Sequence, residues 1–88
     1  MAPFAYFNKQ FVPLDEAKIS IRTNALHYGT GIFEGIRAYW NARRKQLFVL
    51  KLAEHYERLL RNCRVLRLRV GKDVKELSDI TLELLRKN

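Results

Sequence analysis

Residues 27–39 read His-Tyr-Gly-Thr-Gly-Ile-Phe-Glu-Gly-Ile-Arg-Ala-Tyr and hold three of the four glycines of the 88-residue chain. From residue 32 onward, β-branched and aromatic side chains predict a strand, on which successive side chains point to opposite faces. One face then carries Ile32, Glu34, Ile36 and Ala38, and the other carries Phe33, Gly35, Arg37 and Tyr39. The second face has a gap at its glycine, beside aromatic rings and a cation. Two interpretations stay open: a small-molecule pocket, or a central strand with a bulge.

Four further segments on either side of this stretch have strand character. Residues 4–7 and 10–12 are apolar or aromatic with a polar break between them, which predicts a hairpin. Pro13 ends this hairpin because proline cannot donate to a ladder. Residues 19–22 alternate apolar and polar side chains, and residues 47–50 form a short apolar run that returns beside the central strand. The sequence therefore predicts an antiparallel sheet of about four or five strands.

From residue 51 the apolar period changes from two to 3.6, which predicts amphipathic helices. The first apolar stripe consists of Leu52, Tyr56, Leu59, Leu60, Cys63 and Leu66. A second stripe follows Gly71 and runs through residues 77–85. Asp73 and Glu76 have the spacing of a capping box, which predicts where the second helix begins. The fold class is therefore α+β, with two amphipathic helices on one face of the antiparallel sheet.

Composition sets limits on the class of protein. The chain is 48% hydrophobic and 30% charged, which is typical of a globular protein. Cys63 is the only cysteine, so no internal disulfide can form and a reducing, cytoplasmic setting is expected. No apolar run approaches membrane-spanning length, and the only histidines, His27 and His55, have no second ligand at metal-site spacing. We therefore expect no membrane partner, no metal site and no hydrolytic triad.

The net charge of +8 raises the alternative of a basic, non-catalytic module that binds nucleic acid or another anion. The densest basic cluster consists of Arg61, Arg64, Arg67, Arg69 and Lys72. However, cations are spread along the whole chain and are mixed with carboxylates in the helical half. This distribution favours a solvated helix surface, so a nucleic-acid partner is not expected.

The first helix offers a possible anion site. His55, Arg58 and Asn62 stand three and four residues apart, so they share a face away from the main apolar stripe. A guanidinium on that face can hold a phosphate with two parallel hydrogen bonds. The alternative is a surface arginine paired with Glu54, four residues earlier.

Two motifs together carry a resemblance to a known family. Residues 27–39, followed by Glu-His-Tyr-Glu-Arg-Leu at 54–59, resemble the N-terminal domain of the branched-chain amino acid aminotransferases, which are fold type IV pyridoxal-phosphate enzymes. The resemblance covers essentially all 88 residues in order. Related D-amino-acid aminotransferases and aminodeoxychorismate lyases tend to carry Asp where this chain has Thr30. That difference favours the branched-chain subgroup, whose enzymes serve branched-chain amino acid biosynthesis.

The resemblance implies roles for individual residues. Arg58 matches the arginine that binds the phosphate of the cofactor, pyridoxal 5'-phosphate. Phe33 and Gly35 match positions that line the pocket for the substrate side chain. Tyr28 matches a tyrosine that reaches into the neighbouring subunit's pocket, so a homo-oligomer, a dimer or higher, is expected. Arg37 lies on the same predicted strand face as Phe33 and Gly35 and is expected to help set the charge of the pocket.

The resemblance also implies what this chain does not contain. Residues 1–88 correspond to the N-terminal small domain, complete or incomplete, and the large catalytic domain is absent. None of the lysines here matches the catalytic lysine, so no catalytic residue is assigned and the fragment alone is expected to be inactive. The intact enzyme is expected to transfer the amino group of Leu, Ile or Val to 2-oxoglutarate. A stand-alone structural domain that dimerises through Tyr28 stays open as a further alternative.

Overall fold

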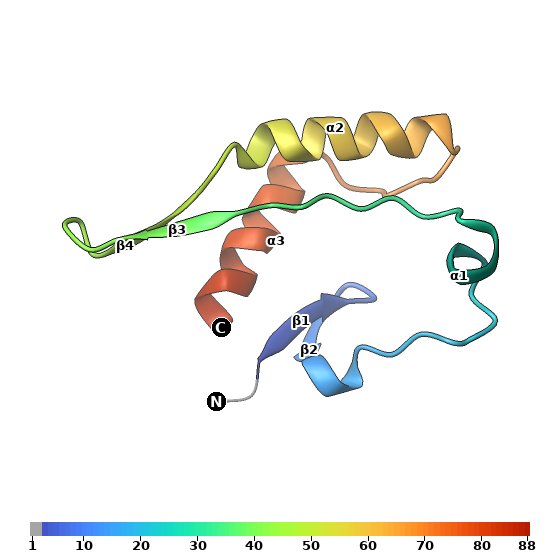
Figure 1. Ribbon diagram of the computed structural model, residues 1–88, viewed down its shortest axis with the longest axis horizontal. Helices are drawn as coiled ribbons and strands as arrows, with labels where there is room; N and C mark the ends of the chain where they lie inside the picture. The colour runs from blue at the N-terminus through green and yellow to red at the C-terminus, as the bar shows by residue number, and fades with distance from the viewer. Residues whose placement is uncertain (1–2) are drawn as a thin grey trace.

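The computed structural model describes residues 3–88, so the first two residues of the expected domain lie outside the described range. The elements, in chain order, are β1 (Phe4–Phe7), β2 (Gln10–Pro13), the 3₁₀ helix η1 (Leu14–Glu16), α1 (Asn24–Tyr28), β3 (Ala38–Asn41), β4 (Gln46–Val49), α2 (Leu52–Val65) and α3 (Val74–Lys87). Figure 1 traces them through an elongated molecule of 45 × 29 × 19 Å. The predicted α+β class is confirmed.

The first hairpin forms as predicted. β1 and β2 pair antiparallel, with Pro13 opposite Phe4 at the end of the ladder. The two turn residues, Asn8 and Lys9, have φ angles of 49° and 66°. Positive φ at both central positions is the mark of a type I′ turn, whose twist matches that of the flanking strands.

The expected single sheet of four or five strands is not confirmed. The described residues form two separate two-stranded sheets, β1–β2 and β3–β4, and residues 19–22 form no strand. α3 packs against β1 and borders a hollow shared with β4, so the helices do not cover one face of one sheet. The period-two pattern specifies which way side chains point but not which segment pairs with which, and a strand needs a hydrogen-bonded neighbour.

Residues 31–37 illustrate this difference. Residues 32–37 were expected to begin the central strand, yet only residues 38–41 pair with β4. The segment instead runs beside α2 (Figure 1) and is tied to the β4 end by a 2.9 Å hydrogen bond from Leu50 N to Arg37 O. Its side chains still alternate, because Ile32, Glu34 and Ile36 are half-buried and the residues between them are exposed. The two predicted faces are therefore real, although the segment has no strand partner among residues 3–88.

Both helices begin and end near the predicted residues, and their apolar stripes are buried or half-buried except at Leu66, which follows the end of α2 and is exposed. Cys63 is 6% exposed, and the Tyr56 hydroxyl is hydrogen bonded to that of Thr81, which joins α2 to α3. The capping box forms: Glu76 N donates to Asp73 Oδ1 at 2.8 Å, and Asp73 N donates to Glu76 Oε1 at 3.2 Å. These local signals suffice for the helices, because a helix satisfies its backbone groups within its own segment.

The end of α3 is fastened to β1. The side-chain amide of Asn88 accepts from Phe4 N at 2.8 Å and donates to Phe4 O at 3.1 Å. A single amide therefore pairs with both backbone groups of one residue, as a neighbouring strand would. No helix in the described part of the chain is long and apolar enough to cross a membrane.

Candidate functional site

A cluster of three ionisable side chains joins residues 31–37 to α2. Glu34 accepts from Arg58 through two parallel bonds, Nε to Oε2 at 2.8 Å and Nη2 to Oε1 at 2.6 Å. His55 Nδ1 lies 2.7 Å from the same Oε1. Since an ionised carboxylate only accepts hydrogen bonds, His55 Nδ1 is the donor. α2 supplies both donors from one face because residues three apart on a helix are neighbours.

The electrostatics of the cluster favour the ionised carboxylate. The hydrogen bond from Arg58 and then that from His55 lower the pKa of Glu34 from 4.5 to about 2, against the opposing effect of burial. The hydrogen bond from Glu34 raises the pKa of Arg58 in turn. The Glu34 side chain is only 7% exposed, whereas that of Arg58 is 55% exposed. The cluster is therefore a fixed ion pair whose cationic partner faces solvent.

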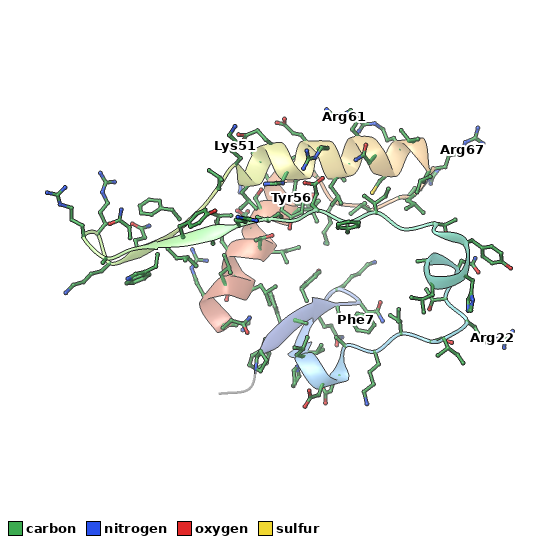
Figure 2. The ribbon with its side chains drawn as sticks, viewed as in Figure 1. Phe7, Arg22, Lys51, Tyr56, Arg61 and Arg67 are labelled. Atoms are coloured by element: carbon green, nitrogen blue, oxygen red, sulfur yellow. The ribbon has the colours of Figure 1, made fainter. Side chains whose placement is uncertain are left out.

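Arg58 borders a shallow hollow of about 310 Å³ on the surface of α2. The hollow is lined by Lys51, Glu54, His55, Glu57, Arg58 and Arg61. Figure 2 shows Lys51 and Arg61 on the outer side of α2, whereas Tyr56 points toward the rest of the molecule. The lining thus places two further cations, Lys51 and Arg61, and two carboxylates around the oriented guanidinium of Arg58. Such a surface suits a small anion that accepts hydrogen bonds from arginine.

The residues expected to line a substrate pocket are all exposed. Phe33 is 90% exposed and Tyr28, at the end of α1, is 76% exposed. Gly35 and Arg37 are exposed on the same side of the segment as Phe33. A Cβ atom at Gly35 would meet nothing within 4 Å. The gap expected from sequence is therefore present as open space beside an exposed phenyl ring.

The structure brings only some of the expected site residues together. Arg58 contacts the strand-like segment through Glu34, so the surface pair with Glu54 that sequence left open is not formed. Phe33 and Gly35 flank Glu34 but are exposed, whereas Glu34 is half-buried against α2. Tyr28 is the last residue of α1, which precedes residues 31–37 and lies apart from the middle of α2 (Figure 1). The phosphate anchor is thus on α2 and the pocket wall on residues 31–37, and Glu34 joins the two.

Glu34 is the member of this cluster that sequence reasoning missed. Alternation places it on the apolar strand face with Ile32 and Ile36 but assigns it no partner. The available signal is the charge itself, because a carboxylate between two half-buried isoleucines requires a cationic partner. Which cation it binds depends on a contact across 24 residues, which local patterns do not specify.

The known proteins that this chain resembles in sequence and those that it resembles in structure carry the same family name. No protein-family model matches the chain. The probable branched-chain-amino-acid aminotransferase of Aquifex aeolicus is 56% identical over 85 residues, which are 97% of this chain and 27% of that protein. The crystal structure of branched-chain aminotransferase from Thermoproteus uzoniensis with norvaline is similar at a TM-score of 0.92 and 39% identity, covering 100% of this chain and 29% of that one.

A third relative was solved with a phosphopyridoxyl ligand. This T.th. branched-chain amino acid aminotransferase, complexed with N-(5'-phosphopyridoxyl)-L-glutamate, has a TM-score of 0.89 and 41% identity, covering 100% of this chain and 29% of that one. This chain thus spans somewhat more than a quarter of the length of the relatives it matches. The resemblance to branched-chain aminotransferases is confirmed in sequence and in structure, and these relatives give no support to a basic binding module.

Proposed function

We propose that this chain is a section of a branched-chain amino acid aminotransferase, a fold type IV enzyme that uses pyridoxal 5'-phosphate. Residues 1–88 are its N-terminal small domain, and the large catalytic domain lies in sequence outside this chain. The observation that carries the proposal is the guanidinium of Arg58, oriented by Glu34 and open to solvent beside the segment that bears Phe33 and Gly35. The relatives named above support the same assignment.

The described residues fit the phosphate group of the cofactor. Two of the three Arg58 nitrogens bind Glu34, and Nη1 has no hydrogen-bond partner among residues 3–88. That free edge can donate to a phosphate oxygen while the ion pair holds the plane of the guanidinium. When bound, the cofactor supplies the electron sink that amino-group transfer requires. This domain contributes the anchor for its phosphate.

The open face of residues 31–37 is proposed to form one wall of the substrate pocket. Phe33 offers an apolar surface, and Gly35 leaves room beside it for a branched aliphatic side chain such as that of Leu, Ile or Val. Burying a side chain of that size stabilises binding by about 1.5–3 kcal/mol. Arg37, on the same side, adds positive charge near the wall, which suits the carboxylates of the substrate and of 2-oxoglutarate.

Tyr28 is proposed to complete the pocket of a neighbouring subunit. It is 76% exposed at the end of α1, so it can contact a second copy without any change in the fold. The intact enzyme is then a homodimer or a higher oligomer whose sites are shared between subunits, and we place it in the cytoplasm. The lysine that bonds to the cofactor belongs to the large domain, so the 88-residue chain alone does not transfer amino groups.

An assay of amino transfer tests this function. The full-length protein that carries this chain is incubated with L-leucine, L-isoleucine or L-valine and with 2-oxoglutarate, and glutamate is measured with and without added pyridoxal 5'-phosphate. We expect glutamate only when the cofactor is bound, and none from the 88-residue chain at the same concentration. Absence of transfer by the cofactor-loaded full-length protein with all three amino acids would overturn the proposal. Transfer by the isolated chain would contradict the proposed location of the catalytic lysine.

A further inference from the structure

We infer that Glu34 is a positioning residue that fixes the guanidinium of Arg58 for binding the cofactor phosphate, with His55 holding the carboxylate in place. The inference rests on the proposed function and adds a residue to it. It starts from an apparent conflict, because Glu34 places a negative charge directly beside an anion site. A carboxylate in that position either weakens the site by neutralising Arg58 or strengthens it by orienting Arg58.

The geometry favours orientation. Arg58 is bound through Nε and Nη2, and these two parallel bonds fix the plane of the guanidinium as well as its distance from the carboxylate. An arginine side chain otherwise loses much rotamer freedom when it binds a ligand. Here that ordering is complete before an anion arrives, although the side chain is 55% exposed. An exposed arginine held in this way is preorganised for its ligand.

The carboxylate is itself held from two sides. The Glu34 side chain is 7% exposed, and its Oε1 atom accepts hydrogen bonds from His55 Nδ1 and from Arg58 Nη2. The half-buried Ile32 and Ile36 stand on the same side of the segment, before and after it. Both oxygens are therefore used, and rotation of the carboxylate would break at least two hydrogen bonds. The same carboxylate links the segment that carries Phe33 and Gly35 to the helix that carries Arg58. It therefore also fixes the position of the proposed pocket wall relative to the phosphate-binding arginine.

The two roles of Glu34 predict opposite effects of removing its charge. If Glu34 positions Arg58, Glu34→Gln in the full-length protein raises the Kd for pyridoxal 5'-phosphate by about 10- to 100-fold, the range seen when the hydrogen-bond partner of a metal-binding side chain is removed. If Glu34 only neutralises Arg58, the same change lowers that Kd. Glu54→Gln is the matched control: it removes a carboxylate from the same hollow, but Glu54 makes no hydrogen bond to Arg58. It is expected to tighten binding by no more than about fivefold.

Pyridoxal, which lacks the phosphate, separates a positioning role from a structural one. Glu34→Gln is expected to leave the Kd for pyridoxal within about twofold of wild type, because Arg58 does not contact that ligand. An equal rise in the Kd values of Glu34→Gln for both ligands would overturn the inference. A Kd for pyridoxal 5'-phosphate that is unchanged in Glu34→Gln, or lowered as in Glu54→Gln, would overturn it too. If Glu34→Gln does not fold, Glu34→Asp keeps the charge but shortens the reach, and the same selective loss is expected.

Arg58→Ala distinguishes failure of this inference from failure of the proposed function. In an Arg58→Ala background, Glu34→Gln is expected to add less than about twofold to the loss, because the two residues act as one unit. A further loss of about tenfold there would contradict the inference. If Arg58→Ala alone leaves the Kd for pyridoxal 5'-phosphate unchanged, the proposed anchor is wrong. If Arg58→Ala weakens binding but Glu34→Gln does not, only the positioning role is wrong.

Discussion

Glu34 lies between two half-buried isoleucines, on the face of residues 31–37 that meets α2. Charged side chains are rarely buried unless they are paired, and this one accepts three hydrogen bonds from two residues of α2. The fold therefore stabilises its ionised form, which lowers its pKa to about 2. This one residue connects the local pattern of the sequence to the electrostatics of the proposed site.

The lowered pKa gives a pH dependence of stability with a defined sign. Because the pKa of Glu34 falls from 4.5 to about 2 on folding, the stabilisation is complete above about pH 4.5 and is lost as the pH falls toward 2. Urea unfolding of wild type and Glu34→Gln should therefore differ most near neutral pH, and the difference should shrink on acidification. Asp79→Asn, which removes an exposed carboxylate, is the control. A difference as large at about pH 3 as at neutral pH would contradict this assignment.

Two glycines of the same stretch should respond differently to alanine. Gly29 ends α1 with a φ of 65°, where a Cβ atom costs about 1–2 kcal/mol. Gly35 has open space around it, so Gly35→Ala should change the free energy of unfolding by no more than about 0.5 kcal/mol. In the full-length enzyme, Gly35→Ala should instead raise the KM for leucine, because the methyl group fills the proposed pocket. Equal destabilisation by both changes, measured by urea unfolding, would contradict this contrast.

The site was predictable from sequence only in part. The motif around Arg58 pointed to an anion site, and the alternation around Phe33 and Gly35 pointed to an open wall. Neither pattern specified that Glu34 joins the two, because that contact spans 24 residues and depends on how the segment lies against α2. The sequence offered Glu54, one turn earlier on the same helix, as a partner for Arg58. In the fold Arg58 binds Glu34 instead.

At the scale of elements, helices and strands were predictable to different degrees. The apolar stripes and the capping box located α2 and α3, because helices are specified by side chains a few residues apart. The first hairpin was also specified by neighbouring residues, since the two residues of its turn adopt positive φ. Residues 19–22 and 32–37 showed the alternation of strands but pair with no strand within residues 3–88. Pairing depends on distant segments, and alternation alone does not identify them.

The capping box makes a prediction at this scale. Asp73→Ala removes the side chain that accepts from Glu76 N at the start of α3, and such losses cost about 1 kcal/mol. Asp79→Ala is the matched control on the same helix, because its exposed pair with Lys75 is worth about 0.2–0.5 kcal/mol. Chemical unfolding of the two variants should therefore show a clearly larger loss for Asp73→Ala. Equal losses would contradict the role of the cap.

Across the whole molecule, the most distinctive feature is how little of it is buried. Among the described residues, Cys63 alone is buried as a whole residue, and large side chains such as Ile21, Phe33 and Trp40 are mostly exposed. Exposed apolar surface of this extent is uncommon on a monomer that stands alone. The two hairpins and the open segment thus present surfaces suited to further contacts, in agreement with a domain that works within a larger enzyme.

The isolated 88-residue chain should therefore be only marginally stable. We expect it to bind an apolar dye such as anilinonaphthalene sulfonate and to unfold over a broad temperature range, because so few side chains are packed on all sides. We propose that the rest of the full-length protein covers these surfaces, so that protein should bind little dye. A sharp thermal transition of the isolated chain, without dye binding, would contradict this view of its surface.

The central claim is that Arg58 anchors the phosphate of pyridoxal 5'-phosphate in the full-length enzyme. The most direct test compares the Kd values for pyridoxal 5'-phosphate and for pyridoxal in wild type and in Arg58→Ala. Losing one partner of a charge-assisted contact costs about 2–5 kcal/mol, so we predict that the first Kd rises by at least about 30-fold. The Kd for pyridoxal should stay within about twofold of wild type. An unchanged Kd for pyridoxal 5'-phosphate would contradict the claim.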